Sequence, residues 1–135
     1  METEKTFIML KPDCIRRGLM GEVISRIENK GYSITNAEMK TLDTKFLYEH
    51  YAHISDQPFF PEVVSYMMSG PVLGLCVCGE NAVTGMRILI GATKFEEAMA
   101  GTIRGDYATS TSYNLVHGSD SREASETELI RFFGA

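Results

Sequence analysis

The amino-acid sequence predicts an α+β fold: an antiparallel sheet with helices on its faces. Two observations lead to this prediction. The hydrophobic periodicity changes repeatedly between that of strands and that of helices, in the order strand, helix, strand, helix pair, strand, helix, strand, helix. In addition, Lys11-Pro12-Asp13-Cys14 after the first strand is not the glycine-rich phosphate loop that an open parallel sheet, the main alternative, would carry there.

The first three elements are visible as changes of period. Residues 6–10 are apolar and run into a Lys-Pro-Asp sequence, which predicts a short strand that ends in a turn. From Leu19 the apolar residues recur at helical spacing until Gly31, which suits the C-cap of a helix. Residues 32–42 then alternate, and a slip of phase midway predicts a β-bulge.

Two helices and a strand are predicted next. Thr44 is placed as the N-cap of a segment that is apolar on one side. Pro61 suits the first turn of a second helix, which the Gly70-Pro71 pair ends. Residues 72–78 form an apolar run of the length of a strand.

The rest of the chain is predicted to hold one more strand between two helices. Asn81 is placed as the cap of a helix through Leu89. Residues 91–112 show no period and are interpreted as a long loop of the kind that is usually functional or mobile. A brief strand over 113–116 and a final helix over 121–133 follow.

This order of elements predicts the topology of the sheet. If the central helix pair is set aside as an insertion between the second and third strands, the β-α-β-β-α-β unit of the ferredoxin-like fold remains. At 135 residues the chain has the length of one domain, so residues 1–135 are interpreted as a single domain.

Charge and composition exclude several classes of function. Thirteen Lys and Arg against 18 Asp and Glu give a net charge of −5, which disfavours stable binding to nucleic acid. No stretch approaches the roughly 18 apolar residues that a membrane helix needs. Three cysteines and no apolar N-terminal signal favour a reducing cytosol, so we expect a cytoplasmic protein.

His117 is the strongest candidate for a catalytic residue. It lies where a predicted strand runs into Gly118 and then into a helix, a position that exposes a side chain to a bulky group. A neutral imidazole can attack phosphorus without a separate base, but its other nitrogen must be held. Glu128 on the following helix is the candidate to hold it, with Glu123 and Glu126 as alternatives. Glu128 also completes the capping-box pattern S-x-x-E with Ser125. Its role could therefore be limited to capping the start of a helix.

Other side chains suggest an anionic, aromatic ligand. Arg104 lies among turn residues of the long loop, and Arg87 ends a helix, where it could equally serve the helix dipole. One ring of the Phe59-Phe60 pair could stack on a base, although such pairs usually fill the core. His50 and His53, three apart on a helix, could share a metal or form a half-buried face.

Several motifs together resemble one known family. Asn114-Leu-Val-His117-Gly-Ser-Asp-Ser121 is similar to the active-site signature of the nucleoside diphosphate kinases, an unusually specific string. Supporting matches span nearly the whole chain: Thr6-Phe-Ile-Met-Leu-Lys11-Pro12-Asp13, Arg17-Gly18-Leu19, His50-Tyr51, Pro58-Phe59-Phe60-Pro61, Ser69-Gly70-Pro71 and Gly101-Thr-Ile-Arg104-Gly105-Asp106.

The resemblance implies an activity and a role for each matched residue. It implies a Mg²⁺-dependent ping-pong exchange in which ATP phosphorylates His117 and the phosphoryl group then passes to a nucleoside diphosphate. No protein side chain is expected to bind the Mg²⁺, which the nucleotide phosphates would hold. The implied roles are orientation of the histidine by Glu128 with Ser119, ribose and phosphate contacts by Lys11 and Asn114, a phosphate clamp of Arg87, Thr93 and Arg104, a phenol near the transferred group from Tyr51, and base contacts by Phe59 and Val63.

The resemblance also implies a homo-oligomer. Residues 94–100 lack the proline that the family generally has in this loop, which contributes to subunit contacts, so a hexamer, a tetramer and a dimer all remain open. Two other classes of function stay as alternatives. One is a nucleotide-sensing module without turnover, and the other is an interaction role added to the enzyme.

Overall fold

The protein folds as a four-stranded sheet in the order β2-β3-β1-β4, with antiparallel pairing between neighbours. The computed structural model describes residues 3–134. The strands are β1 (Thr3–Leu10), β2 (Ser33–Lys40), β3 (Val72–Glu80) and β4 (Val116–Gly118). The α-helices are α1 (Pro12–Arg16), α2 (Met20–Lys30), α3 (Thr44–His50), α4 (Phe60–Met67), α5 (Ala82–Ile90), α6 (Ile103–Tyr107) and α7 (Arg122–Phe133). Two short 3₁₀ helices are η1 (Ala52–Ile54) and η2 (Phe95–Glu97). This strand order confirms the predicted ferredoxin-like topology.

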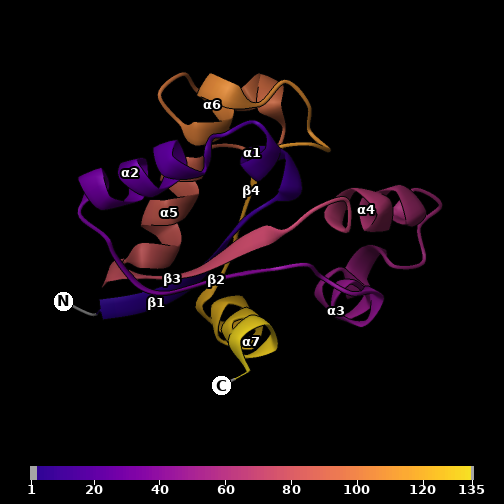
Figure 1. The fold of residues 1–135 in the computed structure, drawn as a ribbon. Helices are drawn as coiled ribbons and strands as arrows, with labels where there is room; N and C mark the ends of the chain where they lie inside the picture. Colours follow the sequence, from indigo (N-terminus) through magenta and orange to yellow (C-terminus); the bar gives the residue numbers. More distant parts are fainter. Residues whose placement is uncertain (1–2, 135) are drawn as a thin grey trace.

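The two faces of the sheet bury separate hydrophobic clusters. Successive side chains of a strand point to opposite faces, so Ile8 and Leu10 of β1 join the cluster that includes α2 and α5. Phe7 and Met9 join the cluster with α3, α4 and α7 on the other face. Figure 1 shows α7 across the sheet from α2 and α5, and shows α3 and α4 as an insertion to one side.

Several local predictions are confirmed. Gly31 ends α2 in the left-handed region, at a φ of 107°, where glycine has no steric penalty. The pairing of β2 with β3 shifts register between Ile34 and Asn36, which is the predicted bulge. Pro61 lies in the first turn of α4.

The N-cap of α3 differs from the predicted residue. Asp43, not Thr44, is the N-cap, because its carboxylate accepts a hydrogen bond from the backbone N–H of Phe46 at 2.8 Å. Thr44 is the first residue of the helix. Asn81 does occupy the cap position of α5, but it has left-handed backbone geometry (φ 50°) and its side chain makes no cap hydrogen bond.

Three other predictions need correction. Residues 91–112 are not a structureless loop, because they contain η2 and α6, and the turn after β1 includes the one-and-a-half turns of α1. Helices of three to five residues are too short to show a period. The last strand spans 116–118 rather than 113–116, because Leu115 takes a φ of 77° and interrupts the extended chain.

One contact fixes α7 against the sheet. Gly74 on β3 lies under the ring of Phe132, so that a Cβ at this position would come within 2.2 Å of the ring. Phe132 is almost fully buried, at 1% exposure. No helix within residues 3–134 is long and apolar enough to cross a membrane.

Candidate active site

The site is built around His117 and Glu128. His117 lies in the middle of β4, opposite Met9 of β1. Its Nε2 is 2.8 Å from Oε1 of Glu128 on α7, and Ser119 Oγ donates to the same oxygen at 2.6 Å. The imidazole is therefore held at one nitrogen by a carboxylate that is itself held by a hydroxyl.

The capping-box interpretation of Glu128 is wrong. The N-cap of α7 is Ser121, whose side chain accepts from the backbone N–H of Ala124 at 3.0 Å. Ser125 lies inside the helix and donates instead to the carbonyl of Lys5. Glu128 is therefore a residue of the second turn, free of any capping role, while Glu123 and Glu126 are exposed on the same helix.

The electrostatics of Glu128 keep its carboxylate charged. Burial raises the pKa of this carboxyl, but the hydrogen bond and charge of His117 and the hydrogen bond from Ser119 outweigh it, and the pKa falls below its ordinary value. The ionised Glu128 carboxylate accepts a hydrogen bond from the Nε2–H of His117, which leaves the lone pair of the neutral ring on Nδ1.

A tight turn places His117 and Asn114 relative to Lys11. Val116 N–H donates to the carbonyl of Asn114 at 2.9 Å, around Leu115 with its positive φ, which makes a γ-turn of the rare, strained kind. Lys11 N–H donates to the carbonyl of Leu115 at 2.8 Å, and Lys11 Nζ donates to Asn114 Oδ1 at 2.8 Å. The end of β1 and the start of β4 are thus tied together at this point.

Three cationic side chains line the same cavity as His117: Lys11, Arg87 and Arg104. Arg104 is buried and donates to the carbonyls of Val116, at 2.6 Å, and Gly91, at 3.2 Å, while its Nε has no protein partner. Arg87 donates to the carbonyl of Gly118 at 3.3 Å. The pKa of Arg104 is lowered to about 10 by burial and by Arg87, so its side chain remains charged at neutral pH.

These side chains line two adjoining cavities. The histidine cavity has a volume of about 230 Å³ and is lined by Lys11, His50, Tyr51, His53, Arg87, Thr93, Arg104, Asn114, His117, Gly118, Asp120 and Glu128. The aromatic cavity has a volume of about 410 Å³ and is lined by Lys11, Tyr51, Ile54, Phe59, Glu62, Val63, Tyr66, Thr93, Thr111, Ser112, Tyr113 and Asn114. They share Lys11, Tyr51, Thr93 and Asn114, so one elongated ligand can occupy both.

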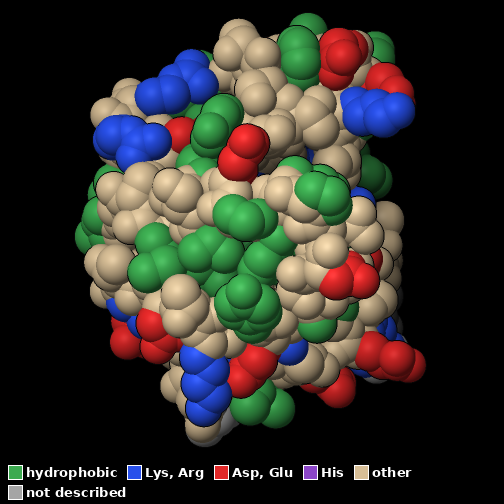
Figure 2. All heavy atoms as spheres, turned by 90° about the vertical axis from the view of Figure 1, so that its right-hand side faces the viewer, with side chains coloured by type: hydrophobic (Ala, Val, Ile, Leu, Met, Phe, Trp, Pro, Cys, Tyr) green, Lys and Arg blue, Asp and Glu red, His purple; other side chains and the backbone are tan. Residues whose placement is uncertain are grey.

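The Phe59-Phe60 pair divides between core and cavity. Phe60 is buried at 2% exposure, whereas Phe59 is 48% exposed and lines the aromatic cavity with Val63. Figure 2 shows the face of the molecule over α3 and α4, where hydrophobic side chains gather. A large apolar ring exposed at a cavity is suited to stack on a planar ligand.

Of the residues to which the family resemblance assigns a role, all but Ser119 line these two cavities, and Ser119 donates its hydrogen bond to Glu128. The predicted pairing of His50 with His53 at a metal differs from the grouping of side chains in the structure. Within residues 3–134, the histidine and carboxylate side chains close enough to share an ion are His50, His117 and Glu128, with ligand atoms within 4.8 Å of one another. His53 is not among them.

Sequence reasoning missed two tyrosines of the aromatic cavity. Tyr66 donates a hydrogen bond to Asp13, and its ring contacts that of Tyr113 edge to face at 4.5 Å. Both positions carried a signal, since Tyr66 is three residues after Val63 on the same helix and Tyr113 directly precedes Asn114. A ligand in this cavity therefore meets phenol rings as well as Phe59.

An imidazole held by a carboxylate, beside a cationic cavity that opens into an aromatic one, is typical of a phosphotransferase that acts on nucleotides. Comparison with known proteins leads to the same class. The family model described as "Nucleoside diphosphate kinase" matches residues 4–135. The chain belongs to the nucleoside diphosphate kinase family.

The chain is similar to nucleoside diphosphate kinases of several organisms. A nucleoside diphosphate kinase of Exiguobacterium sibiricum is 49% identical over 96% of this chain and 94% of its own length, and one of Brevibacillus brevis is 46% identical over 98% and 90%. Among solved structures, the apo enzyme of Encephalitozoon cuniculi superposes with a TM-score of 0.95 at 45% identity, covering 98% of this chain and 90% of that one. The Halobacterium salinarum enzyme in complex with CDP gives 0.95 at 41% identity, covering 99% and 90%.

Proposed function

We propose that the protein is a nucleoside diphosphate kinase that transfers the terminal phosphoryl group of ATP to nucleoside diphosphates through a phosphohistidine on His117. The observation that carries the proposal is the Glu128–His117 hydrogen bond of 2.8 Å, because it fixes the proton on Nε2 and leaves Nδ1 as the nucleophile. With this reaction, residues 1–135 would act as one catalytic domain that supplies NTPs and dNTPs.

The proposed reaction has two mirrored steps. The Nδ1 lone pair of His117 attacks the γ-phosphorus of ATP, the N–P bond forms, and the bond from phosphorus to the bridging oxygen breaks, so that ADP leaves. A terminal phosphate oxygen of a nucleoside diphosphate then attacks the phosphohistidine, and the N–P bond breaks. Nε2 keeps its proton throughout, and the charged Glu128 stabilises the positive ring while phosphorus is attached to it.

The cations of the histidine cavity would bind the phosphates. Phosphoryl transfer needs positioning and charge stabilisation more than covalent work by the protein, and Lys11, Arg87 and Arg104 supply positive charge. The unpartnered buried Nε of Arg104 supports an anionic ligand there. Thr93 would complete this clamp, and the Tyr51 phenol, whose pKa burial raises to about 12, would stay neutral near the transferred group.

The aromatic cavity would bind the nucleoside. Phe59 would stack on the base beside Val63, while Lys11 and Asn114 would contact the ribose hydroxyls. Stacking tolerates any base, because every base has a π-face. The relative from Halobacterium salinarum was solved with CDP, which supports binding of nucleoside diphosphates by this chain as well.

Mg²⁺ is the cofactor that this chemistry implies. The carboxylates lining the histidine cavity are Asp120 and Glu128, and Glu128 already accepts hydrogen bonds from His117 and Ser119. Mg²⁺ prefers six oxygen ligands, so this lining suits an ion that arrives on the phosphates, with Asp120 as the nearby protein carboxylate. When bound, the ion would neutralise charge on the phosphate oxygens in the transition state.

Phosphate labelling tests the proposed function. Mixed with γ-labelled ATP, the protein is expected to gain acid-labile, base-stable label that moves to added GDP, and the His117→Ala variant is expected to gain none. An unlabelled wild-type protein, or label that survives in His117→Ala, would contradict the proposal. ATP binding by calorimetry without label would favour a nucleotide sensor instead.

Assembly and location complete the proposal. We expect a cytoplasmic homo-oligomer, in line with the family resemblance, and the solution mass relative to the 15.0 kDa chain distinguishes a dimer, a tetramer and a hexamer.

A further inference from the structure

His50 is a buried imidazole directly beside the proposed nucleophile. It is the last residue of α3 and is 8% exposed. Its ring stacks on Phe46, with centroids 5.5 Å apart, and meets the ring of His117 almost perpendicularly at 4.6 Å. One wall of the space around the His117 ring is therefore another imidazole, to which the mechanism above assigns no role.

Arg131 determines which nitrogen of His50 carries the proton. Its Nη1 lies 3.3 Å from His50 Nδ1. A guanidinium donates hydrogen bonds and cannot accept them, so Nδ1 must be the acceptor. In a neutral ring with an acceptor at Nδ1, the proton is on Nε2.

The surroundings of His50 keep the ring neutral. Burial lowers its pKa to about 3, with further lowering by His117, Arg131 and Lys11, and Glu128 opposes them. These groups come from β4, α7 and the end of β1. At neutral pH His50 is therefore one of its two neutral tautomers, and the contact with Arg131 selects the one protonated on Nε2.

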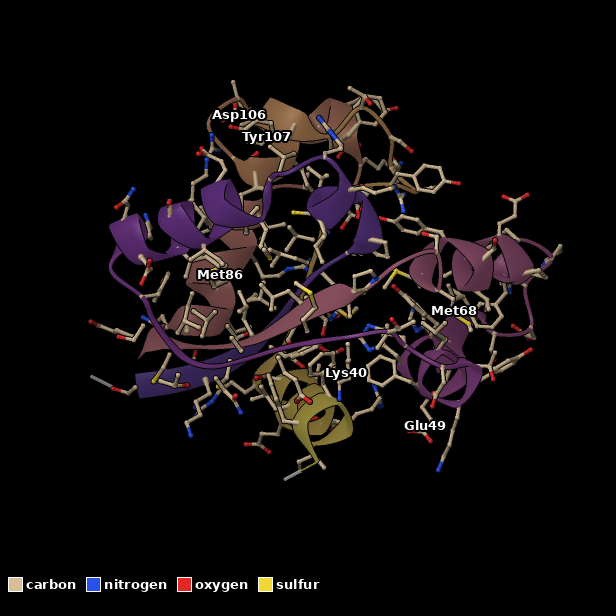
Figure 3. All side chains as sticks on the ribbon, in the orientation of Figure 1. Lys40, Glu49, Met68, Met86, Asp106 and Tyr107 are labelled. Atoms are coloured by element: carbon tan, nitrogen blue, oxygen red, sulfur yellow. The ribbon has the colours of Figure 1, made fainter. Side chains whose placement is uncertain are left out.

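Arg131 is itself anchored outside the histidine cavity. Its Nε is 3.8 Å from Oε2 of Glu49, which lies on α3 and is labelled in Figure 3. Arg131 and Glu49 line a separate depression with Lys40 and Phe46, and Arg131 is not among the residues that line either nucleotide cavity. Arg131 is therefore placed to act on the reaction through the residues that it contacts, rather than by touching a ligand in either cavity.

We propose that Arg131 is a positioning residue that fixes His50 as the Nε2-protonated tautomer, and that His50 in turn holds the His117 ring in the orientation for attack on phosphorus. The inference rests on the proposed function, because it presumes that His117 is the nucleophile. Arg131 and Glu128 are three residues apart on α7, so one helix face serves both imidazoles.

The direct test is the protonation of His50. In ¹⁵N spectra of the imidazole groups, His50 of the wild-type protein is expected as the Nε2–H tautomer, and in Arg131→Leu as a mixture of both tautomers. An unchanged tautomer in Arg131→Leu would overturn the proposal. This measurement needs no phosphoryl transfer, so it stands apart from the labelling test of the proposed function.

The kinetic test separates positioning from binding. Single-turnover phosphorylation of His117 is expected to slow roughly three- to tenfold in Arg131→Leu, the effect of one lost hydrogen bond, with an unchanged KM for ATP. Arg131→Lys keeps a donor and is expected to stay within about twofold of wild type, which also guards against a Leu variant that folds poorly. A wild-type rate in Arg131→Leu, or a loss confined to KM, would contradict the proposal.

Two further variants test the route of the effect. Glu49→Gln removes the ion pair of Arg131 but leaves its contact with His50, so we expect a rate close to wild type. If Arg131 acts through His50, Arg131→Leu is expected to add nothing to the loss caused by His50→Gln. Independent, additive losses would show that Arg131 acts by another route.

Discussion

Lys11 lines both the histidine cavity and the aromatic cavity, and its ammonium group lies where they adjoin. Its Nζ donates to Asn114 Oδ1, and burial together with the nearby charge of Arg104 lowers its pKa to about 8, against an opposing effect of Asp13. A lysine in this position is charged at neutral pH but loses its charge as the pH rises through that value. In the proposed function, the same convergence of cations that would bind phosphate would therefore limit the pH range of binding.

A pH profile tests this property of Lys11. Above about pH 8, kcat/KM for ATP is expected to fall by up to about tenfold per pH unit, because the uncharged fraction of Lys11 in the free enzyme grows. Lys11→Arg is expected to be less active at pH 7, because the planar guanidinium does not reproduce the hydrogen bond from Lys11 Nζ to Asn114 Oδ1. Its pH profile of kcat/KM should stay flat to about pH 10. The same alkaline fall in both proteins would assign it to another group.

At the scale of elements, the position of α7 on the sheet decides whether Glu128 reaches His117. The ring of Phe132 on α7 fits the space that Gly74 leaves on β3. Glu128 lies one turn before Phe132 on the same helix. The packing of Phe132 near the end of α7 therefore helps to place Glu128, in the middle of the helix, within hydrogen-bond distance of His117.

A methyl group at residue 74 tests this alignment. Gly74→Ala is expected to cost about 1–3 kcal/mol of unfolding free energy, because Phe132 must move from a fully packed position. It should also slow labelling of His117, since α7 carries Glu128 with it. Thermal unfolding and the labelling rate check both effects.

Gly21→Ala is the matched control. A Cβ there meets nothing within 4 Å in α2, so the change should stabilise the helix by up to about 1 kcal/mol and leave labelling as in wild type. A Gly74→Ala protein with wild-type stability and rate would show that α7 does not depend on this contact.

The elements differ in how far the sequence could predict them. The bulge in β2 and the glycine end of α2 follow from local patterns, and the structure has both. The start of β4 could not be predicted, because Leu115 takes a positive φ that nothing in its side chain favours. The hydrogen bond from Lys11 N–H to the Leu115 carbonyl holds it there, a contact across more than 100 residues of chain.

The site was predictable to the extent that its residues lie in specific motifs. His117 and Glu128 are close in sequence, and the choice between orientation and capping depended on where α7 begins, which is a tertiary fact. Tyr66 shares a helix face with Val63, but helix packing also explains this spacing, and it explains the pattern around Arg131. Their relation to the site exists only once α3, α4 and α7 meet on one face of the sheet.

At the scale of the whole molecule, a net charge of −5 opposes the approach of the anionic ligand that the proposed function assigns to the histidine cavity. The two effects have different ranges. The charges of the surface act over a Debye length, about 30 Å at 0.01 M salt and about 10 Å at 0.1 M, whereas Lys11, Arg87 and Arg104 act at contact. Added salt should therefore remove the repulsion of the surface before it weakens the attraction of the cavity.

This difference predicts a maximum in the salt dependence of kcat/KM for ATP. The value is expected to rise from about 10 mM to about 100 mM salt and to fall beyond it. Glu28→Gln removes one exposed surface charge on α2 and should flatten the rising part alone. Arg104→Gln should lower the value at every salt concentration and flatten the falling part. A steady fall over the whole range in the wild-type protein would mean that the surface charge does not reach the cavity, and that the three cations alone determine the approach of the nucleotide.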